Sequence, residues 1–241
     1  MYANDTLCNV TDTRITSLPA YSGGDGLPCM YSGYEDANAN GTHHLFYWMY
    51  RNSDPNANTV VWLNGGPGSS SMFGNFLENG PLQIFDSLDT ETGLYTFNVT
   101  NNPQGSWADT ANLIFIDQPI NTGFSYSDTP EYLTTMDELS EEFVHFMANL
   151  YLKYPSLLQN TSLYMTGESY GGKYLPVFSN ALLDSDANST YNVTFNVQGT
   201  LVGDPYTAPL TQRTSVYEVP YALNIIDETN LPQVSALIRR C

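Results

Sequence analysis

A short glycine-rich stretch, TGESYGGKYLP at residues 166–176, constrains the fold of this chain more than any other part of its sequence. It continues from the apolar run SLYMTG, which is typical of a buried strand, and it leads into GGKYLPVFSNALL, whose apolar spacing is typical of a helix. Gly167, Ser169 and Gly171 form the pattern G-x-S-x-G, which is typical of a sharp strand-to-helix turn that exposes a serine hydroxyl. Small residues flank the serine because such a turn leaves no room for side chains. Ser169 is therefore a candidate nucleophile.

The same stretch also matches most of the phosphate-binding pattern G-x-x-x-x-G-K, through Gly167, Gly172 and Lys173. That pattern needs Ser or Thr after the lysine, because the hydroxyl binds magnesium, and Tyr174 occupies this position. Glu168 would also place a negative charge inside the phosphate cradle. The sequence therefore favours the nucleophile turn, and it predicts no metal and no other cofactor.

The chain is strongly acidic, which restricts its partners. It has 241 residues, with 7 Lys+Arg against 25 Asp+Glu and a net charge of −18 at pH 7. Such a surface repels nucleic acid and anionic membranes, and it suits an acidic compartment in which some carboxylates are neutralised. No apolar run approaches the length of a membrane span. We expect a globular protein that binds no nucleic acid and spans no membrane.

Strand and helix signals alternate along the chain, which is typical of an α/β protein. Thr135 and Glu138 form a capping box that predicts the start of a helix, and the residues KYP at 153–155 would end it. His145 lies off the apolar face of this helix, so we expect it in solvent. The C-terminal stretch YALNIIDETNLPQVSALIRRC predicts helix in two pieces around Pro232. Five apolar runs predict strands: HLFYWMYRN, TVVWLN, NLIFID, SLYMTG and FNVQGTLVGD.

A second glycine-rich motif, VVWLNGGPGSSS at residues 60–71, supports the nucleophile interpretation. Enzymes of acyl transfer aim backbone N–H groups at the oxyanion of the tetrahedral intermediate. In α/β-hydrolases one donor is the residue after the nucleophile, here Tyr170, and another comes from a glycine-rich loop after an earlier strand. The NGGPG loop precedes Ser169 in the chain, which is the order that this arrangement requires.

Four motifs together resemble the serine carboxypeptidases: WLNGGPGSSS, ENGP at 78–81, IDQPINTGFSYS at 116–127 and TGESYGGKYLP. The resemblance covers nearly the whole chain. It implies an α/β-hydrolase fold, with a mostly parallel central sheet and flanking helices, and the removal of single residues from peptide or protein C-termini. It further implies that residues 1–241 form the N-terminal part of one such domain. The fold would be incomplete at its C-terminal side, because the chain ends near the start of the family's cap insertion.

The resemblance also assigns roles to individual residues. Ser169 would be the nucleophile, and the amides of Gly66 and Tyr170 would form the oxyanion hole. Two glutamates near a substrate carboxylate repel it unless at least one is protonated, so we expect the best binding at acid pH. The residues that would hold the terminal carboxylate of the substrate are Asn64, Glu78 and Glu168, supported by Trp62 and the amide of Gly65.

A serine nucleophile needs a base, and no histidine follows Ser169 in this chain. His43, His44 and His145 all precede it, with no convincing site around them. The resemblance places the catalytic Asp and His beyond residue 241. The chain could be one half of a processed enzyme, a fragment, or a truncated homologue that binds without cleaving. An acyltransferase of the same family, in which an alcohol replaces water, is a further alternative, although the carboxylate-binding set favours a peptidase.

The cysteines and glycosylation signals bear on the compartment. Cys8 and Cys29 could pair or both be free, and the resemblance implies a partner for Cys241 further along the precursor. Ser69 stands where the family usually has a cysteine, and Asp204 where it usually has asparagine. We expect a secreted protein or one of a lysosomal or vacuolar lumen. Seven N-x-S/T sequons lean the same way, at Asn4, Asn9, Asn40, Asn98, Asn160, Asn188 and Asn192.

Overall fold

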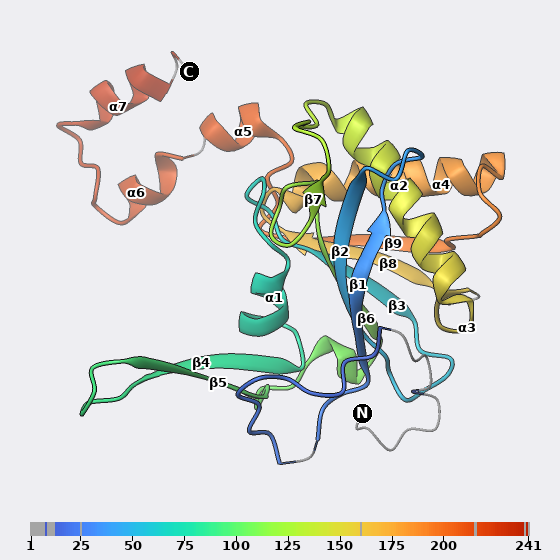
Figure 1. The fold of residues 1–241 in the computed structure, drawn as a ribbon. Helices are drawn as coiled ribbons and strands as arrows, with labels where there is room; N and C mark the ends of the chain where they lie inside the picture. Colours follow the sequence, from blue (N-terminus) through green and yellow to red (C-terminus); the bar gives the residue numbers. More distant parts are fainter. Residues whose placement is uncertain are drawn as a thin grey trace.

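The computed structural model describes residues 8, 13–24, 26–159, 161–214, 216–238 and 240. At its centre is a seven-stranded sheet in the order β1-β2-β6-β3-β8-β9, with β7 paired to β2 (Figure 1). The four strands from β6 to β9 in this order are parallel, and β1, β2 and β7 add an antiparallel margin. The strands are β1 Met30–Asp36, β2 His43–Tyr50, β3 Thr59–Leu63, β6 Asn112–Asp117, β7 Tyr126–Ser127, β8 Leu163–Glu168 and β9 Val197–Gly203.

The sheet is buried on both faces, which explains why its central strands are continuous apolar runs. In β6 every residue is buried. Leu113 and Phe115 point into one core cluster, and Ile114 and Ile116 point into the other, because successive side chains of a strand alternate between faces. All five predicted strands are confirmed.

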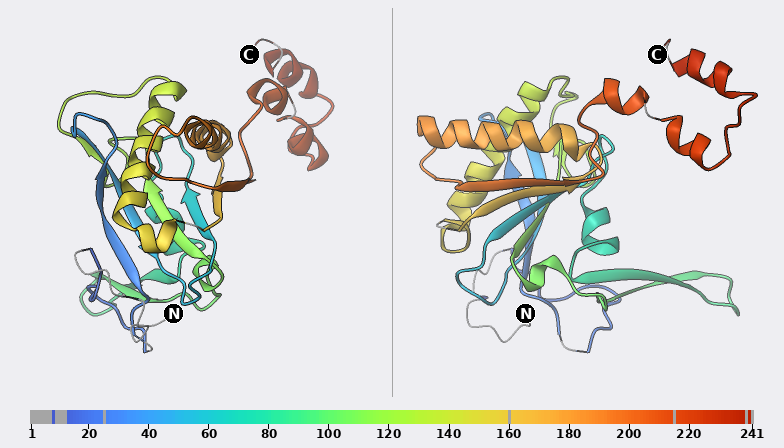
Figure 2. Two further views of the ribbon diagram at one scale, coloured as in Figure 1. Left: turned by 90° about the vertical axis from the view of Figure 1, so that its right-hand side faces the viewer. Right: turned by 180° about the vertical axis from the view of Figure 1, so that it is seen from behind.

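Helices cover the two faces unequally (Figure 2). The larger core lies beneath α2 (Met136–Lys153), α3 (Pro155–Leu158) and α4 (Gly171–Asn188), and α1 (Met72–Leu77) with the 3₁₀ turn Trp107–Asp109 packs on the other face. The capping box at α2 is confirmed. The Thr135 hydroxyl accepts from the Glu138 amide at 3.2 Å, and the Glu138 carboxylate accepts from the Thr135 amide at 3.0 Å.

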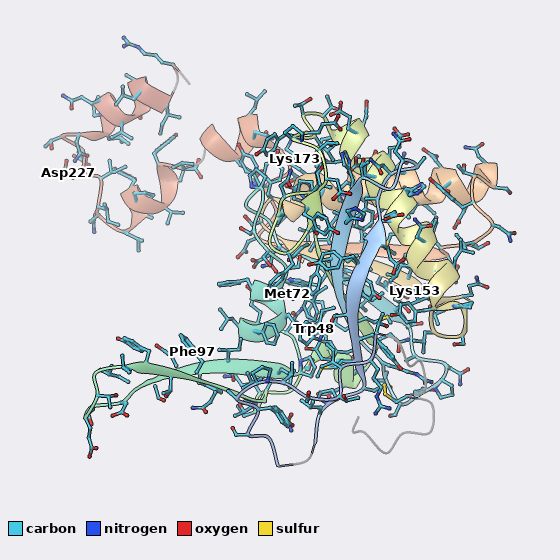
Figure 3. All side chains as sticks on the ribbon, viewed as in Figure 1. Trp48, Met72, Phe97, Lys153, Lys173 and Asp227 are labelled. Atoms are coloured by element: carbon cyan, nitrogen blue, oxygen red, sulfur yellow. A yellow bond between two sulfur atoms is a disulfide. The ribbon has the colours of Figure 1, made fainter. Side chains whose placement is uncertain are left out.

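A β-hairpin that was not predicted projects from the body, formed by β4 (Leu82–Leu88) and β5 (Tyr95–Asn101) (Figures 1 and 3). Leu82 and Val99 join the core at its base, whereas Leu88 and Phe97 on the same face of the ribbon are exposed. The alternation of apolar and polar residues here is a strand signal.

The C-terminal helices lie to one side of the sheet (Figures 1 and 2). They are α5 (Pro209–Thr214), α6 (Glu218–Ala222) and α7 (Leu231–Ile238), and neither α6 nor α7 has a buried residue. The two predicted helical pieces are present, but the predicted break at Pro232 is misplaced. The helices part at residues 223–230, and Pro232 lies in the first turn of α7, where an N–H would have no helical acceptor. Among the described residues, none of the helices is both long and apolar enough to cross a bilayer.

Cys8 and Cys29 form a buried disulfide, which settles the alternative that the sequence left open. Such bonds persist in oxidising compartments. Four of the sequons, at Asn40, Asn98, Asn188 and Asn192, carry exposed asparagines. Asn4, Asn9, Asn160 and Cys241 lie outside the described residues.

Candidate active site

Ser169 lies between the end of β8 and the start of α4, at the carboxyl edge of the parallel strands. Its φ of 54° is in the left-handed region, which is uncommon for a residue with a side chain and marks a constrained backbone. Hydrogen bonds on both sides hold this conformation. The Ser169 amide donates to the carbonyl of Gly203 at 2.9 Å, and the Ser169 carbonyl accepts from the Tyr206 amide at 2.8 Å. The side chain is exposed, as a nucleophile requires.

The neighbouring strand explains why glycine stands before the serine. A Cβ atom at Gly167 would overlap the carbonyl oxygen of Leu63, because β3 and β8 are paired at this point. The turn and the end of β3 therefore pack backbone to backbone, and the sequence motif reflects this close approach.

The NGGPG loop leaves β3 beside the turn that carries Ser169. A Cβ atom at Gly65 would lie 2.5 Å from the amide nitrogen of Tyr170 and 2.9 Å from the Cβ of Ser169, so the two motifs are in contact. Neither the Gly66 amide nor the Tyr170 amide donates to an acceptor among the described residues. A cavity of about 480 Å³ opens here, lined by Asn64, Gly65, Gly66, Ser69, Ser70, Phe73, Glu168 and Ser169.

Asn64 is buried at the edge of this cavity and has one fixed orientation. Its side-chain oxygen accepts from the Trp62 indole N–H at 2.9 Å and from the Gly74 amide at 3.0 Å. Its Nδ2 consequently points the other way and donates to Oε1 of Glu168 at 2.9 Å. Trp62 also packs edge-on against Trp107, with ring centroids 5.2 Å apart. The structure thus places three of the predicted residues in a single network.

Glu78 follows α1 and joins the same network. Its burial raises the pKa of the carboxyl, the negative charge of Glu168 raises it further, and a hydrogen bond with Asn64 partly offsets both effects. A carboxyl with a raised pKa stays protonated over a wider range of acid pH and can then donate a hydrogen bond. The predicted set of Trp62, Asn64, Gly65, Gly66, Glu78, Glu168, Ser169 and Tyr170 is therefore brought together by the fold.

None of the histidines lines the Ser169 cavity in the described part of the chain. His43 is buried between Glu142 and Glu131. The Glu142 carboxylate is hydrogen-bonded to Nδ1 of His43, and Oε2 of Glu131 is 3.2 Å from Nε2 of His43. His44 lies between Asp36 and Asp128, with nitrogen–oxygen distances of 3.0 and 3.3 Å.

The expectation that His145 is in solvent is only partly met. It is half-buried, and its Nδ1 is 3.1 Å from the Tyr191 hydroxyl, because the segment after α4 folds back over this side of α2. Across the described residues, no group of three or more His, Cys, Asp or Glu is arranged to hold a metal ion.

Sequence reasoning missed Asp117, which ends β6 and is fully buried beside the site. Its carboxylate accepts from the hydroxyl of Ser70 and the amide of Ser71, both at 2.7 Å, and from the amide of Phe124 at 2.9 Å. Burial raises the pKa of Asp117, and these hydrogen bonds offset part of the rise. The available signal was an aspartate at the end of a buried strand, within the IDQP motif.

Known proteins resemble this chain in sequence and in fold. A family model described as serine carboxypeptidase matches residues 26–240. The pheromone-processing carboxypeptidase kex1 of Aspergillus oryzae is 35% identical over 225 residues, which is 92% of this chain and 34% of that protein. The corresponding KEX1 of Blastomyces gilchristii is 34% identical over 98% of this chain and 36% of its own length.

A solved structure of a prohormone-processing carboxypeptidase, Kex1(delta)p from Saccharomyces cerevisiae, is also similar. It matches with a TM-score of 0.76 and 26% identity, over 89% of this chain and 47% of that chain. The chain spans about a third of the length of the curated relatives that it matches, 34% and 36% for the two carboxypeptidases named above. It has the α/β-hydrolase fold, and it belongs to the serine carboxypeptidase family.

Proposed function

We propose that this chain carries the nucleophile and substrate-binding half of a serine-type carboxypeptidase. Ser169 would attack the last peptide carbonyl of a substrate, release the C-terminal residue and form an acyl-enzyme, which water then hydrolyses. The observation that carries the proposal is the contact between Gly65 and the turn at Ser169 and Tyr170, with 2.5 Å between a Cβ at Gly65 and the Tyr170 nitrogen.

The oxyanion hole would consist of the Gly66 and Tyr170 amides. Both belong to segments that meet at Ser169, and neither is engaged by an acceptor among the described residues. Backbone donors fixed in this way stabilise the charge that develops in the tetrahedral intermediate without reorganising.

The terminal carboxylate of the substrate would bind to Asn64, Glu78 and Glu168. Asn64 is held by Trp62 and the Gly74 amide, so its Nδ2 donor is already oriented. Protonated Glu78 would supply a second donor in place of the Arg or Lys that usually binds carboxylates. This requirement is the physical reason to expect activity in an acidic lumen or in acidic secretions, and the disulfide fits such a compartment.

The base would come from a C-terminal segment of the same precursor, which would contribute Asp and His. The outer edge of β9 is unpaired in the described sheet. Exposed strand edges and exposed apolar side chains are typical of surfaces that another segment covers. The exposed apolar residues near this edge, on the C-terminal helices and between α6 and α7 include Leu201, Leu210, Val219, Leu223, Ile225 and Leu237.

A second candidate is a binding protein that kept the fold and lost catalysis. The observation in its favour is that none of the described histidines lines the Ser169 cavity. The two candidates differ in the reactivity of one hydroxyl, since an unassisted serine is a weak nucleophile.

Labelling with a fluorophosphonate separates these candidates. The protein is isolated from its source with any co-purifying segment and treated with the probe, and a Ser169→Ala variant serves as the control. We expect Ser169 to be labelled, and mass spectrometry to find an associated segment that contains histidine. A protein that stays unlabelled and has no such segment would be the binding homologue.

A further inference from the structure

Asp117 connects the loop after β3, which lines the candidate active site, to the loop after β6, and none of the roles above uses it. Its carboxylate accepts hydrogen bonds from Ser70 and Ser71 in the loop after β3, and from Phe124 in the loop after β6. Its backbone carbonyl accepts from the Ser125 hydroxyl at 2.5 Å. A fully buried carboxylate normally costs stability, and here several donors from two loops satisfy it.

A chain of contacts leads from Asp117 to Asn64. The Ser71 amide donates to Asp117, and the Ser71 hydroxyl accepts from the Asn64 amide at 3.1 Å. Ser71 directly precedes α1, whose Gly74 amide donates to the Asn64 side-chain oxygen at 3.0 Å. Asp117 thus fixes both the backbone of Asn64 and the helix that orients its side chain.

Both carboxylate oxygens of Asp117 accept hydrogen bonds. One oxygen is used by Ser70 and Ser71 and the other by Phe124. A Cβ atom at Gly123 would overlap the second oxygen, so backbone surrounds it closely. An amide in place of the carboxylate would turn an N–H group toward one set of donors, and those donors would lose their acceptor.

We propose that Asp117 is a positioning residue for the site that binds the substrate's terminal carboxylate, acting through Ser71 and α1 on Asn64. The inference rests on the proposed function of Asn64, and it assigns no contact between Asp117 and substrate. Loss of Asp117 should weaken the preference for a free C-terminal carboxylate and leave binding of the rest of the peptide nearly unchanged.

The test measures binding, so that it does not depend on turnover. The complete protein, with any co-purifying C-terminal segment, carries Ser169→Ala and is titrated calorimetrically at acid pH. The two probes are N-acetyl-Phe-Leu and its C-terminal amide. The readout is the Kd of the amide divided by the Kd of the free acid, which measures the preference for the carboxylate. Asp117→Asn is compared with Asp128→Asn, which changes an exposed aspartate of the loop after β7 in the same way.

We expect Asp117→Asn to reduce the Kd ratio by about tenfold, the loss expected for a misplaced hydrogen bond to a charged group, with the Kd of the amide changed by less than about twofold. Asp128→Asn should leave the ratio unchanged. If Asp117→Asn does not fold, Ser71→Ala serves as the second variant. It removes only the hydroxyl that accepts a hydrogen bond from the Asn64 amide, and it should also lower the ratio.

An unchanged ratio in a folded Asp117→Asn or Ser71→Ala protein overturns the inference. A parent protein that binds both probes equally also overturns it, because there is then no carboxylate site to position. A parent that prefers the free carboxylate but shows no turnover before the Ser169→Ala change contradicts the proposed catalysis alone, and Asp117 keeps its role if the ratio falls.

Discussion

The carboxyl of Glu78 is half-buried beside the negative charge of Glu168, and its burial and that charge raise its pKa. Below this raised pKa, neutral Glu78 can donate to a substrate carboxylate, and above it the second negative charge repels the substrate. We therefore predict that peptides with a free C-terminus bind most tightly at acid pH and more weakly as pH rises through that pKa. Titrations from about pH 4 to pH 8 measure this dependence.

The variant Glu78→Gln supplies the control for that titration. Its side chain is neutral throughout the range, so the pH dependence of binding should flatten. A wild-type Kd that does not change over the range would contradict the role of Glu78, and so would a Glu78→Gln variant with the wild-type profile.

Gly65 is a backbone position at which close packing excludes any side chain. A Cβ atom there would lie 2.5 Å from the Tyr170 nitrogen, so Gly65→Ala must push apart the two segments that would form the oxyanion hole. We predict that the rate of fluorophosphonate labelling of Ser169 falls by at least about tenfold, with about 1–3 kcal/mol lost from the free energy of unfolding. Gly24→Ala is the matched control, because a Cβ at Gly24 meets nothing within 4 Å. Equal labelling rates for both variants would disprove the prediction.

These residues also show how far sequence alone reaches. The tight turn around Ser169 was predictable because a backbone contact that leaves no room for a Cβ requires glycine, and glycine is visible in the sequence. The role of Asp117 was not, because its donors at residues 70, 71 and 124 come from loops that only the folded sheet brings together. Likewise, nothing local in the sequence shows that Glu78 lies beside Glu168 rather than in solvent.

At the scale of single elements, α2 begins at a capping box whose two reciprocal bonds join Thr135 and Glu138. Removing the hydroxyl leaves the Glu138 amide without its acceptor at a helix end, so Thr135→Ala should cost about 1 kcal/mol of unfolding free energy. Urea denaturation of the purified protein measures the loss. The exposed Thr90→Ala, outside any helix, should change the value by less than about 0.5 kcal/mol. Equal losses in both variants would rule out a specific effect of the cap.

Elements were predictable where a local signal suffices, and less so elsewhere. The cap and the apolar stripe of α2 are local, and the helix has the predicted limits within a few residues. The β4–β5 hairpin was missed although its alternation of apolar and polar residues is a local strand signal. What the sequence does not show is that apolar side chains such as Tyr95 and Phe97 stay exposed. The proline in α7 misled the prediction because a proline in the first turn of a helix and a proline that ends one have similar local sequences.

At the scale of the whole molecule, the sheet order brings the carboxyl ends of β3, β6 and β8 together. This order places every residue of the candidate site except those of α1 and Glu78, which follows it. Short apolar runs predict that these strands are buried, but their order and the pairing of β3 between β6 and β8 are long-range facts. The resemblance to a family supplied the fold class and a mostly parallel sheet in advance, but not this order.

The charges of the whole molecule predict a stability that falls toward neutral pH. Glu78, Asp117 and Glu142 have pKa values that are raised chiefly by burial. At a pH between the pKa of such a carboxyl in the unfolded chain and its pKa in the folded protein, the folded state therefore binds more protons than the unfolded state. The free energy of unfolding must therefore decrease as pH rises through the raised values. The net charge of −18 at pH 7 adds self-repulsion in the same direction.

The exposed carboxylates set the acid limit of this stability. The pKa values of Asp89, Glu138 and Asp227 are lowered by hydrogen bonds from nearby amides and hydroxyls, so their contribution is present above the ordinary carboxyl range and is lost as pH falls through the lowered values. We predict the highest Tm near pH 5, about where ordinary carboxyl groups have become charged, and a lower Tm at pH 8. Calorimetric scans at fixed ionic strength measure it, and added salt should reduce the difference by screening self-repulsion without abolishing the part due to buried carboxyls. A Tm that rises from pH 5 to pH 8 would show that the buried carboxyls do not dominate.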